Sequence, residues 1–135
     1  MPDPSVLQHI LVKVYRSADR LMVATPMPGV EPEDISVEIT GENRLILQSR
    51  WRGELKGIKQ QLVNEWRPGG YYRELELPHA VDGTLANVTY NNGIVVVALP
   101  LAEQTRPARL ALDVLEATHG VLARNAGHPV RPRHP

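Results

Sequence analysis

The sequence predicts an all-β fold, an antiparallel β-sandwich, for this chain of 135 residues. Asn92-Gly93 lies between two runs of strand-forming residues, and this pair tolerates positive φ so well that it is the strongest short signal for a β-hairpin. Residues 34–40 alternate apolar and polar side chains, as a half-buried strand does. Phenylalanine is absent and aromatic residues make up only 4%, so the core must consist of valine, leucine and isoleucine, which a thin sandwich permits.

The first half of the chain contains four predicted strands. In the third, Ile35, Val37 and Ile39 share one face and polar residues occupy the other. The second is stopped by Pro26 and Pro28, because proline has no amide hydrogen to donate in a central ladder. The four strands cover residues 9–15, 21–25, 34–40 and 44–49.

Two Leu-Pro pairs end the predicted strands of the second half. Leu77-Pro78 closes the run that begins at Tyr71, and Leu99-Pro100 closes the run after the Asn-Gly turn. Residues 94–99 are almost all β-branched, which predicts that both faces of this strand are covered. Residues 50–70 are too many for an ordinary hairpin loop, and loops of this length in compact domains are usually functional.

Composition excludes several classes of protein. The length suits one domain. Lysine plus arginine equals aspartate plus glutamate at 15 each, so the chain lacks the basic excess that nucleic acid attracts. The absence of cysteine excludes disulfides and cysteine-ligated zinc and suits a reducing compartment. With neither a long apolar run nor a signal peptide, the chain is expected to be cytoplasmic and to have no membrane partner.

Catalytic and cofactor sites are not expected. Gly69-Gly70 precedes a predicted strand and not a helix, so it does not make a phosphate-binding loop and no ATP site is predicted. Glu31, Glu33 and Asp34 form an acidic turn and not an opposed acid-base pair. The histidines lack metal-ligand spacing, so no metal is predicted; they are His9, His79, His119, His128 and His134. The sequence therefore predicts a protein that is not an enzyme and carries no cofactor.

Three motifs, in order and over residues 10–112, resemble the α-crystallin domain of the small heat-shock protein family. The first is the Met-Pro-Gly-Val run at residues 27–30 with the acidic turn and strand that follow, and the second is Gly70-Tyr71-Tyr72-Arg73 with its Leu-Pro. The third has Ala86, then Gly93-Ile94-Val95 and the closing Leu99-Pro100. The resemblance implies an immunoglobulin-like antiparallel β-sandwich of seven to eight strands. It divides the chain into an N-terminal arm (1–9), the α-crystallin domain (10–100) and a C-terminal extension (101–135).

The resemblance also implies an activity in the stress response. Such a protein is expected to be an ATP-independent chaperone, a holdase that binds partly unfolded client proteins through apolar surface and prevents their aggregation. By family position the groove residues are Ile35, Val37, Ile39 and Leu85. For the first three, simple core packing is the alternative, since an alternating strand must bury one face in either case.

The long loop has an implied role in dimer formation. In the bacterial and plant branch of the family the corresponding loop carries a strand that pairs with the first strand of the partner, and residues 60–66 would be that strand here. Leu62 and Trp66 are the candidate anchors, and Arg73 is assigned to the same interface. The implied assembly is a homodimer or a small homo-oligomer. The alternative is a flexible hairpin loop that contains a tryptophan.

Leu110 and Leu112 occupy the position of the family's C-terminal assembly motif. Two residues apart on an extended strand, their side chains point the same way, and the family adds this strand to a neighbour's apolar groove. Alternatively these residues begin a helix or pack back onto the groove of their own subunit. A helix is predicted at residues 114–124, with Asp113 as its cap, followed by a disordered tail at 127–135.

The chain departs from the family pattern in its short N-terminal arm, in its C-terminal helix and in Glu74 and Glu76, where relatives often carry basic residues beside Arg73. An alternative function is that of a co-chaperone-like β-sandwich that binds a larger chaperone. The long loop and the motif at residues 110–112 disfavour it. A small β-barrel enzyme is a second alternative, disfavoured by the lack of a convergent ionisable cluster.

Overall fold

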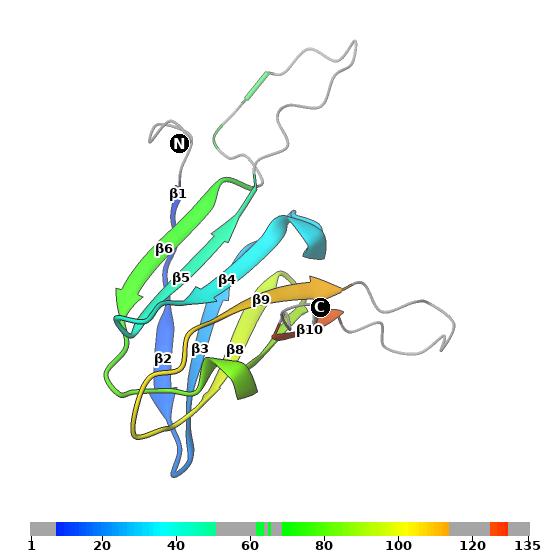
Figure 1. Cartoon of the computed structure of the whole chain (residues 1–135). Helices are drawn as coiled ribbons and strands as arrows, with labels where there is room; N and C mark the ends of the chain where they lie inside the picture. Colours follow the sequence, from blue (N-terminus) through cyan, green and yellow to red (C-terminus); the bar gives the residue numbers. More distant parts are fainter. Residues whose placement is uncertain (1–7, 51–61, 64, 66–68, 114–124, 130–135) are drawn as a thin grey trace.

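The computed structural model of the protein describes residues 8–50, 62, 63, 65, 69–113 and 125–129. Within these residues it contains ten strands and two short 3-10 helices (Figure 1). The helices are η2 (Pro32–Asp34) and η3 (Gly83–Leu85). The strands are β1 (Gln8–His9), β2 (Lys13–Arg16), β3 (Arg20–Pro26), β4 (Ile35–Ile39), β5 (Arg44–Ser49), β6 (Tyr71–Glu76), β7 (Asn87–Asn91), β8 (Ile94–Pro100), β9 (Ala108–Asp113) and β10 (Asn125–Pro129).

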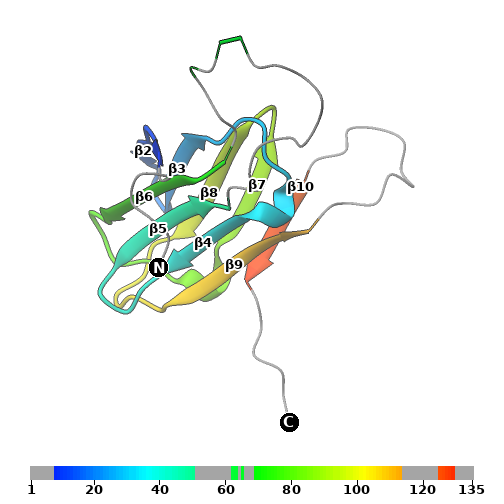
Figure 2. The ribbon, with the colours of Figure 1, turned by 90° about the horizontal axis from the view of Figure 1, so that it is seen from above.

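The strands form two layers that meet along one side. In order of hydrogen bonding they run β1-β6-β5-β4-β9-β10-β7-β8-β3-β2. Seen from above, β6, β5, β4 and β9 make one layer and β7, β8 and β3 make the other, with β10 beside β9 (Figure 2). All strand pairs are antiparallel except β1 with β6. The predicted all-β sandwich is confirmed, with more strands than the seven to eight expected.

Most local predictions are confirmed. Strand β5 covers the predicted residues 44–49, and β4 buries the predicted apolar face. At the turn between β7 and β8, Asn92 and Gly93 both have positive φ (53° and 77°), as the Asn-Gly pair predicts. The outer face of β8 is covered only in part, because Ile94 is 39% exposed.

The N-terminal segment crosses from one layer to the other, and the single strand predicted at residues 9–15 is wrong. β1 lies parallel to β6, whereas β2 pairs with β3 in the opposite layer. Between them Ile10 enters the core, while its amide still donates to the carbonyl of Tyr72 at 3.4 Å. The buried hydroxyl of Thr25 donates a hydrogen bond of 2.7 Å to the carbonyl of Leu11. The chain thus connects the two ends of the strand order through residues 10–12.

The C-terminal residues correct two predictions. Leu110 and Leu112 lie on a strand, so the alternative that they begin a helix is wrong. Residues 127–129, predicted to be disordered, are part of β10, which pairs with β9 on one side and β7 on the other. The helix predicted at residues 114–124 lies outside the described residues, as do residues 130–135 of the predicted tail.

The core is aliphatic, as the composition predicts. Side chains with at most 1% exposure come from both layers. Two tyrosines at the edge of this core have bonded hydroxyls: Tyr71 donates to the carbonyl of Pro28 at 2.8 Å and Tyr90 to that of Met27 at 2.7 Å. Burial raises the pKa of Tyr90. Because Tyr71 is on β6 and Tyr90 is on β7, the loop after β3 that contains Met27 and Pro28 is attached to both layers. The largest fully buried side chains are Leu21, Val23, Met27, Val37, Ile39, Leu45, Leu47, Val81, Val88, Val95, Leu99 and Leu110.

Candidate functional site

The groove residues predicted on β4 face the core. Ile35, Val37 and Ile39 are 3%, 1% and 1% exposed, as the core-packing alternative predicts. One edge of β4 pairs with β5 and the other with β9. The edge of β4 opposite β5 is therefore covered by β9.

The two leucines of the C-terminal motif pack into the core of their own subunit, on the strand that pairs with β4. Leu110 stands opposite Val37 in the register of β4 and β9. It is 2% exposed and Leu112 is 4% exposed, and both belong to the same core cluster as the β4 side chains. The structure thus has the arrangement in which the motif packs back onto its own groove.

Leu85 is separate from the other predicted groove residues. It is the last residue of η3 and is 68% exposed. The carboxylate of Asp82 caps this short helix by accepting from the amide of Thr84 at 3.0 Å. The structure does not bring Leu85 and the buried β4 residues onto one open surface.

The residues predicted for strand exchange are described only in part. Leu62 and Val63 are 84% and 72% exposed, so both present apolar surface. Trp66 lies outside the described residues, as do most of residues 60–66. Pairing of this segment with a partner stays a prediction.

Arg73 binds the N-terminal segment of its own chain. Its Nη1 donates to the carbonyl of Ile10 at 3.1 Å and lies 2.9 Å from Nε2 of His9. Its neighbours Glu74 and Glu76 both form ion pairs with Arg44 on β5. Glu74 Oε2 lies 2.9 Å from Arg44 Nη2, and Glu76 Oε1 lies 3.7 Å from Arg44 Nη1. The acidic residues that depart from the family pattern therefore have a basic partner on the adjacent strand.

The free edge of β2 lies in the first predicted strand, with which a partner's loop strand is expected to pair, although its side chains are not among the predicted site residues. β2 pairs with β3 on one side and, among the described residues, with nothing on the other. Val14 and Tyr15 on this strand are 36% and 48% exposed, and Leu11 before it is 75% exposed. The signal was present in the sequence, because apolar residues occur on both faces of this short segment. Such an edge is a template for pairing with another chain.

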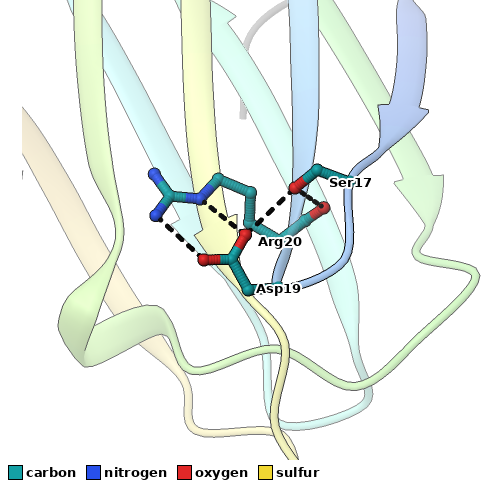
Figure 3. Close-up of polar contacts among 3 residues, drawn as sticks. All are labelled: Ser17, Asp19 and Arg20. Carbon is teal, nitrogen blue, oxygen red and sulfur yellow. Dashed lines mark hydrogen bonds and ion pairs between the residues drawn. The ribbon is translucent and has the colours of Figure 1, made fainter.

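Hydrogen bonds and an ion pair around Asp19 hold the turn from β2 to β3 (Figure 3). Asp19 accepts from Ser17 Oγ at 3.0 Å and from Arg20 Nε and Nη2, each at 3.3 Å. The hydrogen bonds from Arg20 and then Ser17 lower the pKa of Asp19. This turn follows Arg16 and so sets where the free β2 edge ends.

Two kinds of site are absent from the described residues. No group of three or more histidine, aspartate or glutamate side chains there is placed to hold a metal ion. No helix of that part of the chain has the length and apolar character needed to cross a membrane.

Comparison with known proteins gives consistent matches. The model of the Hsp20/alpha crystallin family matches residues 13–112. Spore protein SP21 of Stigmatella aurantiaca is 26% identical over 73% of this chain and 58% of its own length. The 17.7 kDa class II heat shock protein of Arabidopsis thaliana is 27% identical over 81% of this chain and 71% of its own.

Solved structures show the same fold. Heat shock protein 16.0 from Schizosaccharomyces pombe has a TM-score of 0.62 and 24% identity, over 73% of this chain and 92% of that one. A small heat-shock protein from Xylella fastidiosa, described as having a distinct high order structure, has a TM-score of 0.58 and 20% identity, over 73% and 90%. This chain spans little more than half of spore protein SP21, at 58%.

Proposed function

Because the chain belongs to the Hsp20/alpha crystallin family, we propose that it is an ATP-independent chaperone, a holdase that binds partly unfolded proteins and prevents their aggregation. The family match over residues 13–112 carries the proposal. The mechanism is burial without bond chemistry. Apolar surface of a client that leaves water contributes roughly 25 cal/mol per Å², so binding requires no particular sequence and competes with client self-association. We further propose a cytoplasmic location.

The exposed apolar residues are the surface that clients would meet. Leu85 is open to solvent, as are Leu11 and Tyr15 near the β2 edge. Ile35, Val37 and Ile39 would contribute only after β9 leaves β4. Two modes of client binding follow, one on the open surface and one that depends on release of β9.

The proposed assembly is a homodimer formed by strand exchange. The β2 edge offers free backbone groups with Val14 and Tyr15 beside them, and Leu62 and Val63 present apolar side chains on the long loop. A strand from a partner's loop that adds to β2 would cover both sets. Deletion of residues 54–66 should then give a monomer by light scattering. A deletion variant that stays dimeric with unchanged affinity would place the interface elsewhere.

Aggregation of a heated model client tests the chaperone function. Light scattering should stay low when the pure protein is added without nucleotide. Serum albumin at the same mass concentration controls for nonspecific crowding. Unchanged scattering at a several-fold molar excess of the protein would contradict the holdase proposal and favour a co-chaperone-like binding module.

A further inference from the structure

The linker between β8 and β9 is bound to its own domain along its length. The amide of Leu101 donates to the carbonyl of Asp19 at 2.9 Å, and that of Ala102 donates to Ala80 at 3.0 Å. Further along, the amide of Arg106 donates to the carbonyl of Val81 at 3.0 Å. These acceptors lie in the β2 to β3 turn and in the segment before η3, so the linker crosses its own subunit in a fixed path.

Asn43 provides a side-chain anchor for the same linker. Its Nδ2 donates to the carbonyls of Leu77 and His79 at 3.3 and 2.9 Å, which orients the amide. Its Oδ1 then accepts from the hydroxyl of Thr105 at 2.8 Å. Asn43 thus connects the β4 to β5 turn, the segment after β6 and the linker.

Gly83 allows the closest approach. Its amide donates to the carbonyl of Arg106 at 2.7 Å. A Cβ at Gly83 would lie 2.5 Å from that oxygen and 3.1 Å from both the amide nitrogen and the Cβ of Ala108. A side chain at this position would push the end of the linker and the first residue of β9 away from η3.

We propose that the linker, residues 101–107, is a latch that commits β9 to the β4 edge of its own chain and closes this edge to the C-terminal strand of a second copy. Once Arg106 is fixed, only Pro107 precedes β9. Two residue steps of extended chain span about 7 Å, so β9 must begin within that distance of Arg106 on its own domain. The inference concerns strand pairing within this chain and does not depend on client binding.

A cysteine pair across β4 and β9 tests which chain provides the strand. The protein has no cysteine, and Ser36 and Ala111 are exposed and directly opposite each other. Opposed Cβ atoms lie ~4.5–5.5 Å apart, close to the ~3.5–4.5 Å of a disulfide. Oxidised Ser36→Cys with Ala111→Cys should run as a monomer with an internal link on a non-reducing gel. A mixture of the two single variants should give no linked dimer containing one of each.

Gly83→Ala tests the latch itself, with Gly41→Ala as a matched control because no atom lies within 4 Å of a Cβ there. In the double cysteine variant, Gly83→Ala should reduce the internal link. In the mixture of the two single cysteine variants, it should produce linked dimers containing one of each. Gly41→Ala should change neither result. Thr105→Val keeps the side-chain shape without the donor and should shift the products in the same direction by less. If circular dichroism shows that Gly83→Ala is unfolded, Thr105→Val alone tests the latch.

Three outcomes would overturn the proposal. The first is a linked mixed dimer with the natural linker, and the second is absence of the internal link in the double cysteine variant. The third is an unchanged internal link in folded Gly83→Ala or, where that variant unfolds, in Thr105→Val.

Discussion

The N-terminal and C-terminal segments both complete the sandwich, but they do so with different surfaces. β2 has all four residues exposed and, within the part of the chain that the structure describes, pairs on one edge only. β9 pairs on both edges and buries Leu110 and Leu112 in the core. β2 pairs with β3, the next strand in sequence, whereas β9 pairs with β4, which lies far from it in sequence. The difference is the burial of side chains, which makes β9 part of the stability of the fold and leaves β2 available to a partner.

Replacing both leucines of β9 should have the largest effect. Replacing a buried leucine by alanine lowers the free energy of unfolding by roughly 2–5 kcal/mol, and the total for a domain is about 5–15 kcal/mol. Leu110→Ala with Leu112→Ala should therefore lower the free energy of unfolding by about 4 kcal/mol or more. Urea unfolding followed by circular dichroism measures this.

The matched change in the other segment is Val14→Ala with Tyr15→Ala, on the exposed strand β2. Its effect on a monomer should stay below about 1 kcal/mol, as for most surface substitutions. If the leucine variant kept its stability and lost only higher assemblies, the leucines would serve a neighbour and the comparison would fail.

The next effect concerns the attachment of the N-terminal segment. Thr25 is 1% exposed and its hydroxyl bonds the carbonyl of Leu11. Thr25→Val removes this donor and should cost about 0.5–1.5 kcal/mol, the usual net contribution of one hydrogen bond. Hydrogen exchange should rise at residues 8–16 more than at β9. Equal acceleration in both segments would show that they do not open independently.

The ion pair across β4 and β9 should contribute less. Arg109 Nε lies 3.9 Å from Glu38 Oε2, and the arginine side chain is 81% exposed. Exposed pairs contribute about 0–1 kcal/mol, so Arg109→Ala should shift the urea midpoint only slightly. A loss as large as that of the double leucine variant would mean that charge, and not burial, holds β9.

The smallest effect is the pH dependence of the β2 to β3 turn. The pKa of Asp19 is lowered from its ordinary value of 3.8, so its contribution is present above that pH and is lost as pH falls through the folded value. Asp19→Asn should differ slightly from the natural protein at neutral pH, and the difference in thermal midpoint should vanish in strong acid. A difference that grows on acidification would contradict the stated contacts.

Sequence patterns that span only a few residues are sufficient to predict some of the strands. The alternation around Val37 and the Asn-Gly pair give β4, β7 and β8 without tertiary information. The break at Ile10 is not visible locally, because it arises where the chain crosses between layers. β10 contains asparagine, glycine and proline, which are poor strand formers, and its pairing depends on strands on either side. The two leucines predict an apolar partner, but not whether that partner belongs to the same chain.

The position of β9 also affects the order of folding. β4 is complete at Ile39, but the strand that covers its edge begins at Ala108. Contacts between residues so far apart form late, because the entropy of closing the loop opposes them first. Synthesis proceeds from the N-terminus, so a nascent chain keeps an uncovered β4 edge until Leu112 has been made. During that interval the growing chain displays the kind of apolar β-structure that its finished copies are proposed to bind.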